Sequence, residues 1–171
     1  AAQPAWAALP YTERAAILRR AGDIWRANAA EIEQWDVRES GKIPGAVQFE
    51  THVATEEIFE AATLPTRPSG ELLPSEQPNL SFIERVPVGV VGVIAPFNFP
   101  QILAIRSVAP GLALGNAVVL KPDPRTAVCG GVVLARVFEE AGLPEGLLHV
   151  LPGGPDVGEA LVADPLVRLI S

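Results

Sequence analysis

Apolar residues in the first third of the chain recur at the spacing of amphipathic helices. Thr12 can cap a helix whose apolar face carries Ile17, Leu18, Ala21, Ile24 and Trp25. Ile32 and Trp35 predict a second, shorter helix that ends near Gly41. A third helix is predicted for residues 45–62, and its inner face carries Val47, Val53, Ala54, Ile58 and Ala61. Its acidic residues are expected to face solvent: Glu50, Glu56, Glu57 and Glu60.

The next segment, residues 64–79, is rich in proline and polar residues and is expected to be mostly loop. Short strands are predicted at residues 71–73 and 80–86, although the second alternates poorly between apolar and polar positions. An exposed ribbon of this kind often takes part in contacts between subunits.

From residue 89 onward, short apolar strands alternate with helices. Strands are predicted at residues 90–95, 117–121, 147–151 and 167–170, and helices at 100–114, 126–141 and 156–163, with Thr126 capping the second of these helices. This alternation is typical of βαβ units and a parallel sheet. We therefore predict an α/β fold in which N-terminal helices and a short β-ribbon precede a Rossmann-like parallel βαβ sheet, truncated after its fourth strand.

Composition narrows the range of functions. The 171 residues include 20 acidic and 13 basic side chains, a net charge of −7, so neither nucleic acid nor an anionic membrane surface is expected as a partner. One cysteine excludes a disulfide framework, and with two isolated histidines it leaves no expected metal site. Arg106 is the only charge between residues 86 and 120, but four prolines break this stretch into pieces too short to span a membrane.

The ends of the sequence carry two further expectations. The N-terminus lacks the basic segment of a signal peptide, and we expect a cytoplasmic protein. The sequence contains no methionine and stops directly after a predicted strand. It is therefore expected to be part of a larger enzyme, with an unusually short product as the alternative.

The ends of the parallel strands hold the candidate chemistry, because ligands of open α/β sheets bind there. Asn98 lies between Pro96 and Pro100 in a strand-to-helix turn, where its amide could stabilise an oxyanion. The alternative is that Asn98 simply caps the next helix or forms a turn. Lys121 ends another apolar strand and could bind ribose or phosphate oxygens, or could be an ordinary surface lysine.

The remaining candidates are weaker. The glycines of residues 153–158 could let a ligand approach a helix N-terminus or could simply form a tight turn, and no G-x-G-x-x-G fingerprint occurs. Cys129 has no histidine near it in sequence and is expected to be a buried apolar residue rather than a nucleophile. His149 is expected to be structural and His52 solvated.

Several of these segments together resemble the aldehyde dehydrogenase superfamily. Residues 87–100 (PVGVVGVIAPFNFP) are similar to its oxyanion-asparagine segment, and residues 110–122 (PGLALGNAVVLKP) to its adenosine-side segment. GLPEG at residues 142–146 and GPDVG at 154–158 follow in the family's order and spacing. Residues 106–110 and 121–126 look most like the benzaldehyde dehydrogenase branch.

The resemblance implies oxidation of an aldehyde, aromatic in that branch, to a carboxylic acid through a cysteine thioester, with hydride transfer to NAD or NADP. It implies that Asn98 holds the oxyanion and that Phe99, Leu103 and Arg106 face the substrate tunnel. The cofactor would be contacted by Ile94, Ala95, Pro96, Phe97, Lys121, Pro122, Asp123, Pro124, Gly154 and Gly158.

The resemblance also implies that the chain has three parts. Residues 1–70 would be the helical part of the cofactor domain, 71–87 an oligomerisation ribbon, and 88–171 an incomplete NAD(P)-binding half. A homodimer or homotetramer is expected.

Departures from the family pattern limit what is implied. The catalytic cysteine and general-base glutamate belong downstream of Ser171, so these residues alone are expected to be inactive. Phe97 replaces the commoner tryptophan, Ser107 replaces a frequent lysine, and Pro124 replaces a ribose-binding glutamate, which leaves NAD against NADP open. Two alternatives stay open: a non-catalytic nucleotide-binding or assembly module, and a reductase of acyl-phosphates on a related fold.

Overall fold

A computed structural model describes all residues from 1 to 171, and its first part is helical. The helices are α1 (Gln3–Ala8), α2 (Tyr11–Ala27), α3 (Ala29–Ser40) and α4 (Pro44–Ala61). α3 ends where the sequence predicts, with Gly41 in the left-handed conformation after its last residue. Two details of the prediction are wrong: α1 was not foreseen, and α2 begins one residue before Thr12, with Pro10 at its N-cap position.

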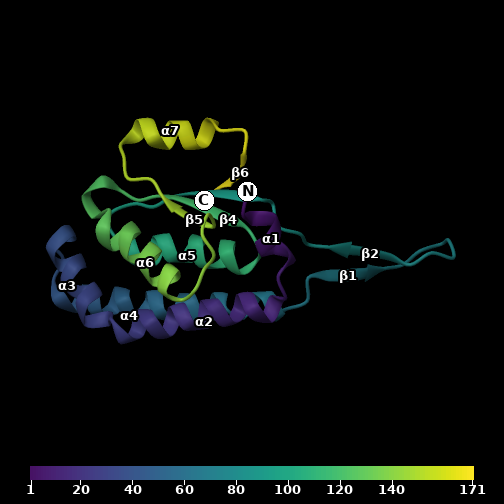
Figure 1. The fold of residues 1–171 in the computed structure, drawn as a ribbon, viewed down its shortest axis with the longest axis horizontal. Helices are drawn as coiled ribbons and strands as arrows, with labels where there is room; N and C mark the ends of the chain where they lie inside the picture. The colour runs from purple at the N-terminus through teal and green to yellow at the C-terminus, as the bar shows by residue number, and fades with distance from the viewer.

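The ribbon forms as predicted and projects from the body of the molecule (Figure 1). A 3-10 turn, η1 (Leu64–Thr66), leads into β1 (Gly70–Leu73), which pairs antiparallel with β2 (Ser81–Glu84). All four residues of β1 are exposed, as are three of the four in β2. The ribbon therefore adds nothing to the core.

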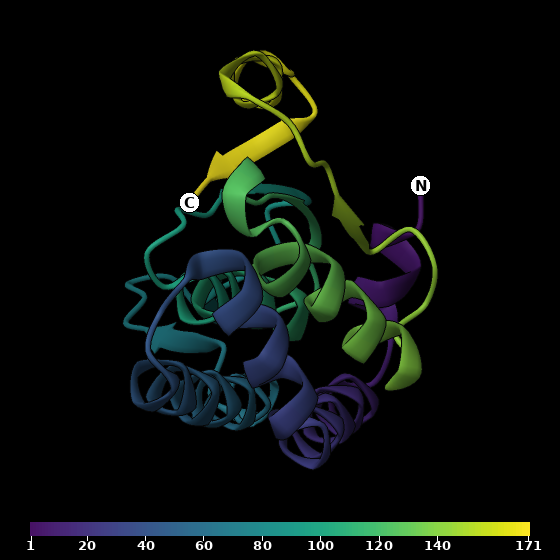
Figure 2. The same cartoon turned by 90° about the vertical axis from the view of Figure 1, so that its left-hand side faces the viewer.

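The second half is a four-stranded parallel sheet in the order β5-β4-β3-β6. Its strands are β3 (Val90–Ile94), β4 (Ala117–Lys121), β5 (Leu148–Val150) and β6 (Val167–Ile170), and its helices are α5 (Pro100–Ala113), α6 (Val133–Glu140) and α7 (Pro155–Ala163). α7 covers one face, while α5 and α6 cover the other and rest in turn on α2 and α4 (Figures 1 and 2). The predicted fold class, an α/β fold with four parallel strands, is confirmed.

The core lies on the α5 side of the sheet. Trp6, Trp25 and Phe138 are its largest buried side chains, and they come from α1, α2 and α6. The indole nitrogen of Trp6 donates to the carbonyl of Leu112, which fastens α1 to the end of α5. No helix combines the length and apolar character that crossing a membrane would require.

The connection between β4 and α6 differs from the predicted continuous helix. It contains a 3-10 turn, η2 (Pro124–Thr126), and a π-helical turn, η3 (Val128–Val132), before α6 begins. Thr126 does not cap it, because its buried hydroxyl has no hydrogen-bond partner. Instead the carboxylate of Glu39 accepts from the backbone N–H groups of Val128 and Cys129, at 2.9 and 2.6 Å.

Candidate functional site

The strand order reverses at β3, which creates a topological switch point beside this strand. The chain leaves β3 toward β4 on one side, whereas β6 pairs with β3 on the other. At this point the backbone N–H of Ile94 donates to the carbonyl of Ser171 at 3.0 Å. Ligands of open parallel sheets bind outside the carboxyl ends of strands at such points. The turn that carries Asn98 is therefore where the topology favours a site.

A shallow cavity of about 440 Å³ lies between the ends of β3 and β4 and helix α7. Ile94 and Lys121 are register partners on the two strands, and both line it. Gly158 faces them from α7, where an added Cβ would lie 3.9 Å from the side chains of both Ile94 and Lys121. Three residues predicted to contact a cofactor, far apart in the sequence, thus share one cavity.

Lys121 has an unusual environment within that cavity. The residue is 7% exposed, yet its ammonium group makes no hydrogen bond or ion pair within the chain. Its ammonium is not among the buried polar atoms that lack a partner, so it reaches the open cavity. The structure thus provides a cationic donor that is free to bind a group in that cavity.

Gly154 has a different position from Gly158. It is the N-cap residue of α7 and does not line the cavity. Beside it, a Cβ on Gly153 would overlap the Val157 side chain. The tight turn considered from the sequence explains Gly153 without a ligand, and contact of Gly154 with the cofactor stays a prediction.

Asp123, Arg125 and Phe97 join the turns after β3 and β4. The Arg125 guanidinium lies 3.6 Å from the centre of the Phe97 ring and pairs with both oxygens of Asp123 at 2.8 and 2.9 Å. These bonds from Arg125 lower the pKa of Asp123 to about 2. Phe97 and Asp123, both expected near the cofactor, are therefore in contact through one arginine.

Asn98 is exposed, and its side-chain amide makes no hydrogen bond within the chain. The N-cap position of α5 belongs to Phe99, and no side chain in this turn caps the helix. The alternative interpretation of Asn98 as a helix cap is therefore wrong. Its amide is free to donate to a ligand.

The three residues expected along a substrate tunnel follow the same face of α5 and the turn before it. Phe99 and Leu103 are half-buried. Arg106 pairs with the carboxylate of Glu57 on α4 at 2.8 and 3.1 Å, and it lines a second, wider cavity of about 930 Å³ that also reaches Ser171. Their role as a tunnel stays a prediction.

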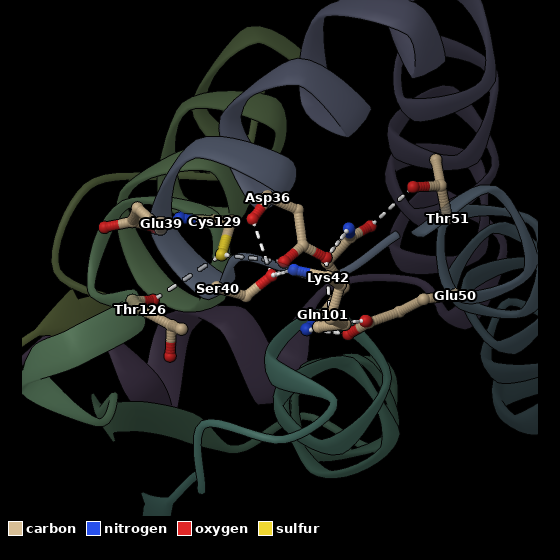
Figure 3. A network of polar contacts seen from close by, with 9 residues as sticks. All are labelled: Asp36, Glu39, Ser40, Lys42, Glu50, Thr51, Gln101, Thr126 and Cys129. Atoms are coloured by element: carbon tan, nitrogen blue, oxygen red, sulfur yellow. Dashed lines mark hydrogen bonds and ion pairs between the residues drawn. The ribbon is translucent and has the colours of Figure 1, made fainter. Parts of the chain in front are cut away.

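Sequence reasoning missed a polar cluster at the N-terminus of α5, in which Lys42 is half-buried and three further residues are buried: Asp36, Glu50 and Gln101 (Figure 3). The expectation that Glu50 faces solvent is wrong, because this residue is fully buried. Positions 47, 50, 54, 58 and 61 follow helical spacing, so Glu50 falls on the apolar stripe of α4. This helical periodicity was the sequence signal that could have predicted the burial of Glu50. In α3 the buried partner of Ile32 is likewise Asp36, while Trp35 is exposed.

The cluster places two carboxylates around one ammonium. Lys42 pairs with Asp36 at 3.1 Å and also with Glu50. Burial raises the pKa of Glu50, and the nearby charge of Asp36 adds to this against the effect of Lys42. Burial alone would raise the pKa of Asp36 as well, but donors from Ser40, Gln101 and Lys42 lower it.

Cys129 is fully buried, as predicted. Burial strongly raises the pKa of its thiol, and the carboxylates of Glu39 and Asp36 add to this effect. A thiol in this environment stays protonated and cannot serve as a nucleophile. Of the two histidines, His52 is exposed as expected; His149 lies in β5 but is exposed as well, so its side chain is not part of the core.

Comparison with known proteins agrees with this architecture. Residues 1–171 match the aldehyde dehydrogenase family throughout. The chain is 72% identical over 170 residues to a vanillin dehydrogenase of Amycolatopsis sp. and 53% identical over 171 residues to a benzaldehyde dehydrogenase [NAD(+)] of Pseudomonas putida, covering 99% of this chain and 35% of each relative. A crystal structure of an NAD-dependent benzaldehyde dehydrogenase from Corynebacterium glutamicum superposes with a TM-score of 0.95 at 44% identity, over 99% of this chain and 37% of that one. The chain thus spans about a third of the length of these relatives, and over its whole length it belongs to the aldehyde dehydrogenase family.

Proposed function

We propose that these residues form the N-terminal part of an NAD(P)-dependent enzyme that oxidises an aromatic aldehyde to its carboxylic acid. The observation that carries the proposal is the exposed, unpaired Asn98 amide in the turn after β3, the strand whose last residue, Ile94, lines the cavity with Lys121 and Gly158. The vanillin and benzaldehyde dehydrogenases among its relatives support an aromatic substrate.

The residues around the cavity fit a dinucleotide. Lys121 has an ammonium without a protein partner, suited to ribose hydroxyls. Gly158 keeps backbone rather than a side chain next to Ile94, where a flat adenine would pack. When bound, the nicotinamide cofactor would accept hydride from the substrate. The name of the Pseudomonas putida relative specifies NAD, which is the cofactor to test first.

Asn98 supplies the electrophilic part of the chemistry in this proposal. Attack of a thiolate on an aldehyde turns its carbonyl oxygen into an alkoxide, and a preformed amide donor stabilises that charge as it develops. Cys129 is not the thiolate, because its thiol is buried and protonated. The nucleophile and the general base would come from the parent enzyme beyond residue 171. Residues 1–171 alone should therefore not oxidise aldehydes.

The exposed ribbon supports the proposal of a homo-oligomer. Phe82 is 64% exposed, and further apolar side chains are exposed beside it: Leu72, Leu80 and Ile83. Apolar strands exposed at an edge favour pairing with another chain. Light scattering of the parent enzyme should give a dimer or tetramer, and Phe82→Glu should shift it toward monomer.

The central test is Asn98→Ala in the parent enzyme with benzaldehyde and vanillin as substrates. Loss of one oxyanion donor should lower kcat about 10²–10³-fold. Gln48→Ala, which removes an exposed amide on α4, outside the ribbon, is the matched control and should leave kcat unchanged. Equal kcat for Asn98→Ala and the unmodified enzyme would refute the proposed role.

A further inference from the structure

The turn that carries Asn98 is not secured by its own residues. Its asparagine makes no side-chain hydrogen bond, Phe99 provides no side-chain cap, and Pro100 has no N–H to donate. Helix α5 therefore begins without the local capping that usually fixes a helix N-terminus. Its position must be set by contacts from elsewhere in the chain.

The missing cap comes from α4. One carboxylate oxygen of Glu50, Oε1, accepts the backbone N–H of Gln101 at 2.7 Å, across 51 residues of sequence. The other oxygen, Oε2, accepts from Lys42, which holds the carboxylate in place. A negative group at this position also interacts favourably with the positive end of the helix dipole. Glu50 thus acts as a cap supplied by a different helix.

Two further contacts hold the same turn. The ammonium of Lys42 lies 5.3 Å from the centre of the Phe99 ring. On the opposite side, Pro100 packs against Gly130 so closely that an added Cβ there would lie 2.8 Å from the Pro100 Cβ. The three residues that follow Asn98 are therefore each held by a residue from a different segment.

The rest of the cluster orients Glu50 and Gln101. The Gln101 side chain donates to Asp36 at 2.8 Å and accepts from the Thr51 hydroxyl at 3.0 Å (Figure 3). Asp36 and Glu50 are completely buried around the single ammonium of Lys42. Such a cluster costs desolvation energy that well-packed apolar side chains would not, so stability alone does not explain it.

We infer that Glu50, held by Lys42, is the positioning residue that sets where the Asn98 amide stands relative to the substrate carbonyl. This rests on the proposed function, because it requires that Asn98 donate to the oxyanion. Glu50 touches neither substrate nor cofactor. It acts through the backbone N–H of Gln101, three residues after Asn98.

The test is a double-mutant cycle in the parent enzyme with benzaldehyde and NAD. Glu50→Ala should lower kcat about 10–100-fold while KM for the aldehyde changes less than about threefold, because a misplaced donor weakens the transition state and not substrate binding. Glu50→Gln keeps the acceptor for Gln101 but loses the charge pair with Lys42, and it should lower kcat about 3–10-fold. In the Asn98→Ala background both Glu50 substitutions should lose most of their effect on kcat.

Thr55→Val is the matched control for the loss of a buried polar group on α4. The Thr55 hydroxyl donates only to the carbonyl of Thr51 in its own helix. This variant should lower the thermal midpoint but leave kcat unchanged at a temperature well below that midpoint. If Glu50→Ala does not fold, the double-mutant cycle with Asn98→Ala is measured with Glu50→Gln instead.

The outcomes separate the two proposals. If Asn98→Ala keeps full kcat, the proposed function fails. If Asn98→Ala is impaired but the Glu50 variants keep kcat, only the positioning role is overturned. An equal loss from Glu50 substitution with and without Asn98 also overturns it, since the effect would then be independent of the amide.

Discussion

The turns after β3 and β4 both border the candidate site, yet they are held in opposite ways. The β3 turn is contacted by Glu50 of α4 and by Lys42 of the loop before it, both more than 50 residues away in sequence. In the β4 turn, Asp123 pairs with Arg125 only two residues later, and the Arg125 side chain is 62% exposed. The turn after β3 is therefore held by contacts from distant segments, whereas the turn after β4 is held by a local ion pair with one exposed partner.

The largest difference should appear on removing the cation of the buried cluster. Lys42→Met leaves Asp36 and Glu50 buried without a positive partner, which should cost about 3–5 kcal/mol of unfolding free energy. Denaturant unfolding of the parent enzyme measures this. Arg136→Met removes one partner of the exposed pair with Glu139 and should change stability by less than about 0.5 kcal/mol. A loss below about 1 kcal/mol for Lys42→Met would mean that the ion pairs of Lys42 stabilise the protein little more than the exposed pair of Arg136 and Glu139 does.

An intermediate effect is expected where η3 touches both turns. Gly130 packs against Pro100 of the first turn, and Gly131 against Pro122 of the second, where a Cβ would lie 2.9 Å from the proline ring. Gly130→Ala should therefore destabilise by about 1–3 kcal/mol through overpacking. Gly45→Ala is the matched control, because no atom lies within 4 Å of its added Cβ, and its thermal midpoint should stay the same or rise. Equal thermal midpoints for Gly130→Ala and Gly45→Ala would show that the close contact between η3 and Pro100 does not limit the space available at residue 130.

Most of the fold could be predicted because its signals are local. β3 and β4 are short, mostly apolar runs rich in valine and lie between glycine and proline residues. Two of the four predicted strands, 117–121 and 167–170, match the structure at both ends. The helix α1 and the π-helical turn were missed because their conformation depends on tertiary contacts, such as the bond of Trp6 to Leu112 and the carboxylate of Glu39 beside η3.

The site was predictable only in part, for a related reason. Strand ends point to Asn98 and Lys121, since topology alone brings the carboxyl ends of neighbouring strands together, whereas Ile94 was implied only by the family resemblance. Glu50 was assigned to the solvent because it is charged, although its helical spacing placed it inward. Its burial depends on Lys42 and Gln101 arriving from other segments, which no local pattern encodes.

The smallest effect should come from breaking the local pair of the β4 turn. The pKa of Asp123, held by Arg125 at about 2 instead of 3.8, is lower in the folded state, so its stabilising contribution is present above pH 3.8 and is lost as the pH falls through 2. Because Arg125 is mostly exposed, solvent screening keeps this contribution small. Unfolding free energies of Arg125→Gln and the unmodified enzyme should differ slightly at pH 7 and converge toward pH 2. In an Asp123→Asn background the same substitution should have an effect that no longer depends on pH. A difference that persists at pH 2 would instead attribute the stabilisation to the stacking of Arg125 on Phe97.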